Sequence, residues 1–236
     1  MEQIRVFIGH DDVENVAFHV LANSIQRHAS VPVSITPVRL SQLKGLYTRD
    51  RDPKQSNEFS FSRFLVPYLA GYEGWAIFMD CDMIMRTDIK ELWDLRDPDK
   101  AIQVVKHKYE PSTSNKYLGA VQYPYPKKNW SSVMLMNCAK CRTLTPAYVN
   151  NASGLELHQF KWLDPQQGER QIGELPKEWN HLVGEVAPNP DAKLVHYTLG
   201  TPCWVDYRDQ EFSDDWALER DLMNKWIEPD ELKSHG

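Results

Sequence analysis

The stretch that decides the fold is an apolar run interrupted by two aspartates, Trp75-Ala76-Ile77-Phe78-Met79-Asp80-Cys81-Asp82-Met83-Ile84-Met85. The residues before Asp80 are apolar and predict a buried β-strand. Burying an ionised carboxylate is costly unless a cation or hydrogen bonds compensate it. Because residues i and i+2 of an extended segment point to the same side, Asp80 and Asp82 can converge on one divalent ion. The alternative is that both aspartates lie in a solvated turn or cap a helix.

The composition is that of an ordinary globular protein. The chain has 236 residues and a formal net charge of −6, which suits one large domain with a sizeable core. No apolar run approaches the ~20 residues that cross a membrane. Glu2, Arg5 and Asp11 interrupt the start, where a signal segment would be apolar, so we expect a cytoplasmic protein. The acidic balance and the dispersed basic residues give no support for nucleic-acid binding.

The first forty residues predict a parallel α/β sheet. Strands are expected at 4–8 and 33–37, with a helix between them whose apolar face includes Val16. In such sheets ligands bind beyond the carboxyl ends of the strands, and Gly9 to Asp12 lie at such an end. Gly9 permits close approach of the backbone, and Asp11 can accept hydrogen bonds from a ribose or base. The alternative is a plain turn with an Asp cap.

The rest of the chain continues the alternation of strands and helices. We expect helices or helical pieces at 60–69, 89–93 and 145–160, and strands at 101–105, 133–137 and 193–197. Polar loops span 40–57 and 106–128, and 163–170 is a polar insertion. A terminal helix and tail are expected within 209–236, and the whole of 1–236 is expected to form one domain. Arg63, the lone charge of its helix, either reaches a phosphate, pairs with Asp80 or is solvated.

Several of these features occur together in one known family, in the same order. They are Gly9-x-Asp11, Arg63, Asp80-Cys81-Asp82, Asp88-Ile89-x-x-Leu92-Trp93, the apolar strand 133–137, Trp179-Asn180 and His196-Tyr197. From Ile4 to Trp204 the chain resembles the retaining nucleotide-sugar glycosyltransferases of family 8, and a diverged bacterial branch in particular. The resemblance implies a GT-A fold, an α/β domain whose Rossmann-like, mostly parallel sheet is flanked by helices.

The resemblance also implies roles for individual residues. Asp80, Asp82 and His196 would bind Mn²⁺ or Mg²⁺. A histidine like His196 taken alone is more often a hydrogen-bonded core or turn residue, and its match to the late His-Tyr motif favours the role of ligand. Asp80, Asp82 and Arg63 would serve catalysis, and Cys81 would contribute its backbone rather than its thiol. Further contacts to the nucleotide sugar would come from Gly9, His10, Asp11, Asn129, Ser131, Asp164, Gln171 and Asn180.

The chain departs from the family pattern in three places. The family's lysine before the late Pro-Trp is missing from Gly200-Thr201-Pro202-Cys203-Trp204. Either another cation, with Lys106 and Lys128 as candidates, neutralises the diphosphate, or the leaving group is stabilised more weakly. The usual Asn-small-Gly is replaced by Asn129-Trp130-Ser131-Ser132. The usual Asp-Gln pair is not evident, and Asp164 and Gln171 are the nearest candidates. The donor base and sugar therefore stay open.

The expected function is transfer of a sugar from a nucleotide-diphosphate donor to an acceptor hydroxyl of a glycan, lipid or protein, with retention of configuration. One rival is a metal-dependent nucleotidyltransferase or nucleotide-sugar pyrophosphatase, although the Gly-rich basic loop typical of triphosphate binding is not visible. The other is an inactive protein that binds a sugar nucleotide or glycan, which the missing lysine keeps open.

Overall fold

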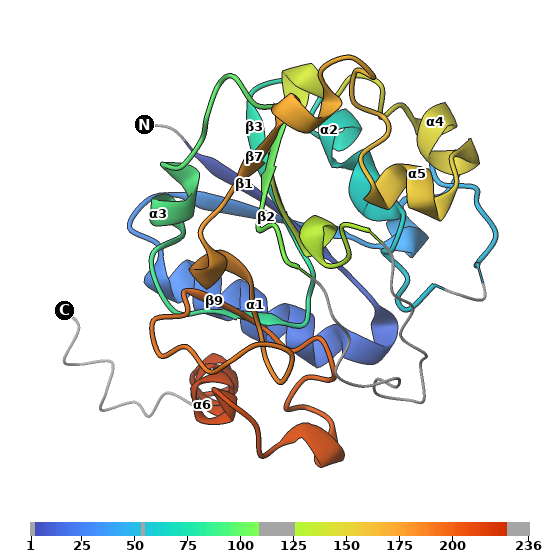
Figure 1. The fold of residues 1–236 in the computed structure, drawn as a ribbon. Coiled ribbons are helices and arrows are strands. Elements are labelled where there is room, and N and C mark those ends of the chain that lie inside the picture. The colour runs from blue at the N-terminus through green and yellow to red at the C-terminus, as the bar shows by residue number, and fades with distance from the viewer. Residues whose placement is uncertain (1–2, 53–54, 109–125, 226–236) are drawn as a thin grey trace.

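The computed structural model describes residues 3–52, 55–108 and 126–225, and within them an α/β fold built on two sheets (Figure 1). The larger sheet has six strands in the order β2-β1-β3-β6-β5-β7. In chain order these strands are β1 (Ile4–Gly9), β2 (Val33–Val38), β3 (Trp75–Met79), β5 (Ile102–Val104), β6 (Val133–Asn137) and β7 (Ile172–Glu174).

The large sheet is mostly parallel, as expected. β1 pairs in parallel with β2 and β3, and β5 with β7, whereas β6 runs antiparallel to its neighbours β3 and β5. β3 lies in the middle, with Phe78 opposite both Phe7 and Met134. Residues 76–79 are fully buried, because a central strand is covered on both faces. This confirms the buried strand predicted before Asp80.

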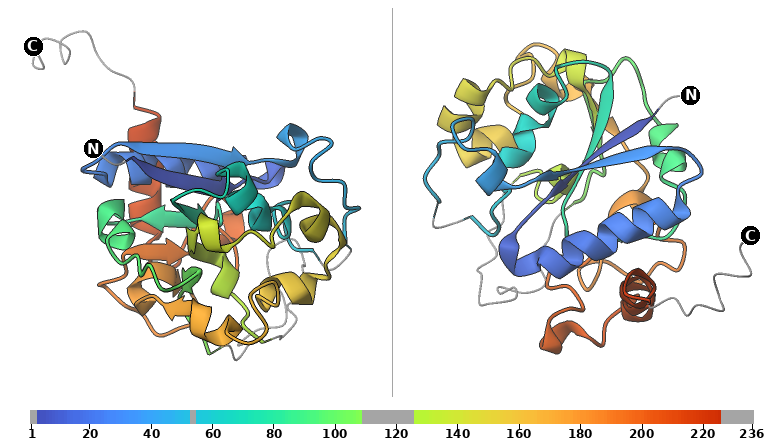
Figure 2. Two further views of the ribbon diagram at one scale, coloured as in Figure 1. Left: turned by 90° about the horizontal axis from the view of Figure 1, so that it is seen from above. Right: turned by 180° about the vertical axis from the view of Figure 1, so that it is seen from behind.

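Two helices, α1 (Asn15–His28) and α6 (Ser213–Met223), pack against each other at one side of the sheets and cross, so that α6 is seen nearly end-on where α1 is seen lengthwise (Figure 2, right). In the chain, α1 connects β1 to β2. Glu219 of α6 is buried, accepts a hydrogen bond from Asn23 at 2.9 Å and forms an ion pair with Arg27. The predicted apolar face of the first helix was wrong at Val16, which is 45% exposed beside the carboxyl end of β1. No helix in the described ranges is long and apolar enough to span a membrane.

The remaining helices are short. The helix predicted at 60–69 is divided into a 3-10 turn, Ser62–Leu65, and the short helix α2 (Val66–Leu69). Pro67, near the start of α2, cannot donate the backbone hydrogen bond that would continue one helix across this position. The other short helices are α3 (Ile89–Trp93), α4 (Pro146–Asn151) and α5 (Gly154–His158), which start at side-chain caps from Asp88, Thr145 and Ser153. The strand β7 was not predicted.

The smaller sheet carries the other half of the decisive stretch. Its strands are β4 (Met83–Met85), β9 (Leu194–His196) and β8 (His181–Leu182), in the order β4-β9-β8. The chain leaves the large sheet at Met79 and enters the small sheet at Met83, so Asp80-Cys81-Asp82 is the bend that joins them. Of the predicted loop 106–128, residues 109–125 lie outside the described ranges, as does the tail from 226 onward.

Candidate metal and donor site

Three side chains meet where the two sheets join. Asp80, Asp82 and His196 each offer one possible ligand atom, and these atoms all lie within 4.8 Å of one another. His196 reaches the motif because β9 pairs with β4 and places it opposite Met83. The Tyr197 N–H donates to the Asp82 carbonyl at 2.9 Å, which continues the pairing. His196 Nε2 lies 3.2 Å from Asp82 Oδ1, so the three predicted metal ligands do come together.

Asp80 is held by a buried cation. Arg63 Nη1 lies 2.7 Å from Asp80 Oδ1, and Arg63 is only 4% exposed. The guanidinium carbon lies 5.3 Å and 5.1 Å from the ring centroids of Phe59 and Phe78. Arg63 Nη1 also donates to the Ser131 carbonyl at 3.0 Å. Of the three alternatives for Arg63, pairing with Asp80 is therefore the one observed, and a solvated side chain is wrong.

On its Nδ1 side, His196 is held by neutral groups. Its Nδ1 lies 2.9 Å from Asn180 Oδ1, and Asn180 is fully buried. The Asn180 Nδ2 group donates to Ser132 Oγ at 2.9 Å and to the Asn129 carbonyl at 3.2 Å. Asn129 has a left-handed backbone (φ 64°), which turns its carbonyl toward this network. Asn180, expected to contact the donor, thus has both polar atoms engaged within the protein.

The carboxyl end of β1 forms a second polar wall. Asp11 is 5% exposed and accepts hydrogen bonds from Val13 N at 3.1 Å and Glu58 N at 3.0 Å. It therefore caps the following turn and also holds the 55–60 segment. A Cβ on Gly9 would lie 2.3 Å from the Phe59 ring, so packing alone requires glycine there. The roles of Gly9, His10 and Asp11 toward a nucleoside stay predictions.

Sequence reasoning missed Glu14, which is 2% exposed beside the motif. The Cys81 thiol donates to Glu14 Oε2 at 3.6 Å. Burial, and then the carboxylates of Glu14, Asp82 and Asp80, raise the pKa of Cys81 well above its usual range. The thiol is protonated at neutral pH, which leaves it without nucleophilic character. The acidic run that follows β1 was the available signal for Glu14.

His107 was also missed. It follows β5 at the same edge of the sheet, and burial lowers its pKa to about 4, with smaller contributions from His196, Lys177 and His181. Its carbonyl accepts a hydrogen bond from Trp130 Nε1 at 2.9 Å. His107 is therefore a neutral imidazole near the triad at physiological pH. A histidine directly after a predicted strand was the signal.

Three other predicted contacts lie elsewhere or face other partners. Asp164 is exposed and caps its own turn through Gln166 N at 2.7 Å. The Gln171 carbonyl bonds Ala101 N at the amino ends of β7 and β5, which is the edge of the sheet opposite the triad. Ser131 Oγ lies 2.8 Å from His158 Nδ1. The described structure thus does not bring Asp164 or Gln171 to the aspartates.

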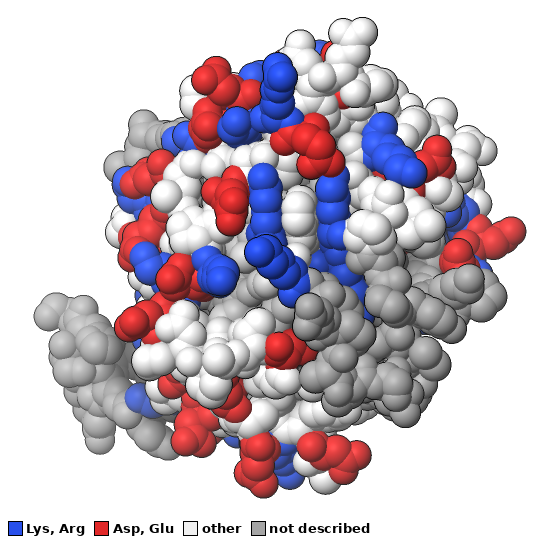
Figure 3. All heavy atoms as spheres, viewed as in Figure 1, with Lys and Arg blue, Asp and Glu red and all other residues white. Residues whose placement is uncertain are grey.

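The candidate replacement lysines lie near the turn at Asn129 and Trp130. Lys128 is only 5% exposed and directly precedes Asn129, whose carbonyl binds Asn180. Lys106 Nζ lies 5.9 Å from the ring centroid of Trp130, and Lys127 Nζ lies 5.7 Å from the same ring. On the face shown in Figure 3, several Lys and Arg side chains lie near the centre, with acidic side chains above them and to their left.

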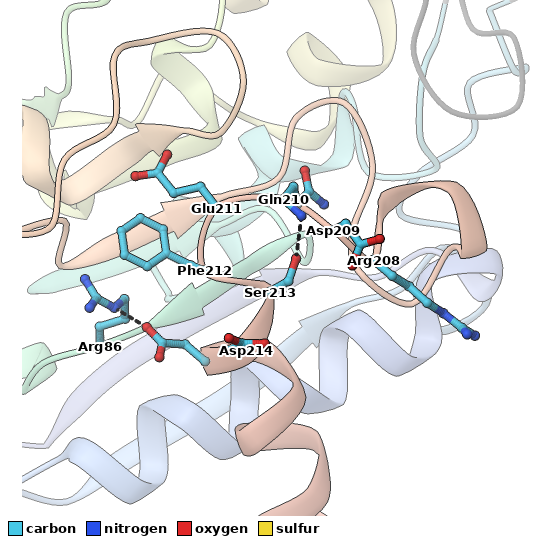
Figure 4. Close-up of a pocket in the computed structure, with 9 residues that line it drawn as sticks. Arg86, Arg208, Asp209, Gln210, Glu211, Phe212, Ser213 and Asp214 are labelled. Atoms are coloured by element: carbon cyan, nitrogen blue, oxygen red, sulfur yellow. Dashed lines mark hydrogen bonds and ion pairs between the residues drawn. The ribbon is translucent and has the colours of Figure 1, made fainter.

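A separate pocket of about 680 Å³ lies beside the start of α6 (Figure 4). None of the three clustered ligands lines it. Arg86 pairs there with Asp215 at 2.7 Å, and its guanidinium carbon lies 4.2 Å from the Phe212 ring centroid. Glu211 accepts from His181 and from Asn189 N. Arg86, Asp215 and Glu211 of this pocket are therefore already engaged by protein partners.

Comparison with known proteins agrees with this geometry. The family model described as Glycosyl transferase family 8 matches residues 2–205. Protein CDI of Arabidopsis thaliana is 46% identical over 230 residues, which are 94% of this chain and 87% of that protein. The expectation of a bacterial branch is therefore not supported, since this relative is a plant protein.

Solved structures show the fold. The bifunctional glycosyltransferase WbbM aligns with a TM-score of 0.66 and 17% identity over 99% of this chain, which spans about half (51%) of that protein. GlyE of Streptococcus pneumoniae gives 0.60 and 15%, covering 95% of this chain and 64% of GlyE. The galactosyltransferase LgtC, solved with donor and acceptor sugar analogues, gives 0.61 and 12%, covering 95% and 98%. These likenesses confirm the expected GT-A fold.

Proposed function

The chain belongs to glycosyl transferase family 8 and is a glycosyltransferase, and we propose that it moves a sugar from a nucleotide-diphosphate donor to an acceptor hydroxyl with the help of a divalent ion. The observation that carries the proposal is the clustering of Asp80, Asp82 and His196 at the carboxyl edge of the large sheet. The relatives in the family support the transfer of a sugar, and the clustered ligands support the ion.

The residues fit a divalent metal. Two carboxylates and an imidazole, nearly buried together, form a donor set that suits Mn²⁺ and also accepts Mg²⁺. A bound ion there supplies neutralisation of the charge that builds on the departing nucleoside diphosphate. The partners Arg63 and Asn180 hold Asp80 and His196 in place before the donor arrives.

Other residues of the same edge bind and orient the donor in this proposal. Asp11, after β1, accepts hydrogen bonds from the nucleoside, and Lys106 or Lys128 supplies the second positive charge beside the diphosphate. Family membership supports retention of the anomeric configuration as part of this proposal. The glycan, lipid or protein that provides the hydroxyl is left to experiment.

A screen of nucleotide sugars with Mn²⁺ and Mg²⁺ tests the proposal. We expect one donor to be turned over only with metal, and Asp80→Ala to lower turnover roughly 10³-fold. Asp94→Ala is the control, because Asp94 is exposed and pairs only with Lys90 in the described structure. Circular dichroism checks that both variants fold.

The products separate the rival functions. Sugar transfer or slow donor hydrolysis releases a nucleoside diphosphate, whereas cleavage of the pyrophosphate bond releases a monophosphate. Tight donor binding without turnover on any acceptor would favour an inactive binding protein. Wild-type turnover by Asp80→Ala would show that the metal assignment is wrong.

A further inference from the structure

The hydrogen bonds around Asn180 leave its amide only one orientation. Its Nδ2 lies 3.2 Å from the Asn129 carbonyl and 2.9 Å from Ser132 Oγ. Ser132 Oγ has one proton and donates it to the same carbonyl at 2.7 Å, so it accepts from Asn180. A flipped amide would place its oxygen against the carbonyl oxygen without a proton between them. The amide nitrogen is therefore fixed on the side of Asn129, and the amide oxygen faces His196.

This orientation decides which nitrogen of His196 carries a proton. Asn180 Oδ1 only accepts hydrogen bonds and lies 2.9 Å from His196 Nδ1, so Nδ1 donates. A neutral imidazole has one N–H, which leaves a lone pair on Nε2. That nitrogen lies 3.2 Å from Asp82 Oδ1, on the side where the candidate ligand atoms gather. In the neutral ring, two acceptors therefore face each other 3.2 Å apart, an arrangement that a divalent ion between them would stabilise.

We propose that Asn180 is the positioning residue of this site: it fixes His196 as the Nδ1–H tautomer and so keeps Nε2 open for a divalent ion. Asn180 is fully buried and both polar atoms of its amide are engaged by protein groups, which suits a positioning role better than contact with the donor. The inference rests on the proposed metal site, but the tautomer can be measured without any metal.

The loss of Asn180 would favour the wrong tautomer. A neutral His196 without its acceptor at Nδ1 gains a hydrogen bond by carrying its proton on Nε2 and donating it to Asp82. The ligand nitrogen would then be blocked. Removal of an outer partner of a metal-ligating histidine lowers metal affinity by roughly 10–100-fold, which is the expected effect of Asn180→Ala.

The tautomer is read by long-range ¹H–¹⁵N NMR of metal-free protein with ¹⁵N-labelled histidine, under conditions where the His196 signals show a single protonated ring nitrogen. His196→Gln identifies the signals. We expect a protonated Nδ1 in the wild-type protein and a protonated Nε2 in Asn180→Ala. A wild-type ring protonated on Nε2 would overturn the proposal even if the enzyme is an active, metal-dependent transferase.

Metal affinity is measured separately, by electron paramagnetic resonance of free Mn²⁺ during titration without donor. Asn180→Ala should bind Mn²⁺ roughly 10–100-fold more weakly than wild type. Ser24→Ala is a matched control, because Ser24 is also buried and its hydroxyl also bonds one acceptor and one donor, Leu21 O at 2.8 Å and Met85 N at 3.0 Å. It should leave affinity unchanged.

Ser132→Ala provides a second variant if Asn180→Ala does not fold. It removes one of the two groups that orient the amide and keeps the Ser132 carbonyl, which receives the Asp80 N–H at 2.9 Å. We expect a smaller loss of Mn²⁺ affinity, roughly threefold or more. If wild type binds Mn²⁺ and the variant that folds binds it equally tightly, the inference about Asn180 is wrong while the proposed function stands. A wild type that binds no Mn²⁺ would instead overturn the proposed function.

Discussion

The two ends of the candidate metal site are held by different kinds of partner. Asp80, on the large sheet, is clamped by the buried cation Arg63, whereas His196, on the small sheet, is clamped by the neutral amide of Asn180. A buried carboxylate needs a positive charge nearby whenever no metal is present, while a neutral imidazole needs only an orientation. We call these the charged clamp and the neutral clamp.

Both clamps converge on one turn. The Ser131 carbonyl accepts a hydrogen bond from Arg63. The Ser132 carbonyl accepts one from the Asp80 N–H, and the Ser132 hydroxyl accepts one from the Asn180 amide. The turn precedes β6, the antiparallel strand next to β3. The same turn therefore supports both clamps. Because Arg63 and Asn180 are different residues, a substitution of either one breaks only its own clamp.

The largest effect should come from breaking the charged clamp. Arg63→Met removes the cation and leaves Asp80 buried without its partner, which should lower the free energy of unfolding by about 3–5 kcal/mol. Urea denaturation at neutral pH measures the change. Arg39→Met is the control, because its pair with Asp12 is exposed and contributes at most about 1 kcal/mol.

Metal should partly restore the loss in Arg63→Met. A cation bound beside Asp80 replaces the missing guanidinium charge, so Mn²⁺ should stabilise this variant more than it stabilises wild type. Equal losses for Arg63→Met and Arg39→Met would show that the charged clamp is no stronger than a surface ion pair.

The second effect concerns pH, and it belongs to the charged clamp. His158 bonds Ser131, and burial together with the charge of Arg63 lowers its pKa to about 3. The unfolded chain binds this proton below about pH 6.5, so wild-type stability should fall as the pH drops from there toward 3. His158→Gln should lose about 2–3 kcal/mol less than wild type between pH 7 and pH 4.5.

Urea midpoints at the two pH values test this expectation, with the variant's own stability at pH 7 as the reference. Parallel pH profiles for wild type and His158→Gln would mean that other groups carry the acid sensitivity. Arg63→Met should raise the pKa of His158, because a neighbouring positive charge is removed.

The sequence predicted what local patterns encode. The strands before Asp80 and after Ser132 are continuous apolar runs, and such runs identify buried strands without reference to the rest of the chain. The convergence of Asp80, Asp82 and His196 was implied by a family pattern, and the pairing of β4 with β9 produces it. Their roles toward metal and donor stay predictions.

What was not predicted depends on contacts between distant segments. The Asn180 amide donates hydrogen bonds to groups 48 and 51 positions away in the chain. The residues next to Asn180 in the sequence therefore do not indicate that its amide is engaged within the protein. Strand β7 is a short edge strand with Gly173 in its middle, which gives no apolar period. The acidic run after β1 includes Glu14, but its burial against Cys81 depends on a contact between residues 67 positions apart in the chain.

The smallest effect should come from the neutral clamp, through the backbone that supports it. Asn129 adopts φ 64°, where a residue with a Cβ is strained and asparagine is tolerated better than most. Asn129→Ala should lower the free energy of unfolding by about 1 kcal/mol, because the alanine Cβ makes the left-handed backbone conformation sterically unfavourable. Asn129→Gly should lose less than Asn129→Ala, since glycine accepts this conformation freely.

This prediction also tests how the turn supports Asn180. Asn129 orients the Asn180 amide only through its backbone carbonyl, which a glycine at this position also has. Asn129→Gly should therefore keep the Nδ1–H tautomer of His196 and near-wild-type Mn²⁺ affinity. Denaturation and the same titration measure both quantities. If glycine destabilised the protein more than alanine, the left-handed turn would not be what holds the carbonyl in place. The neutral clamp would then depend on the Asn129 side chain as well as on the Asn180 amide.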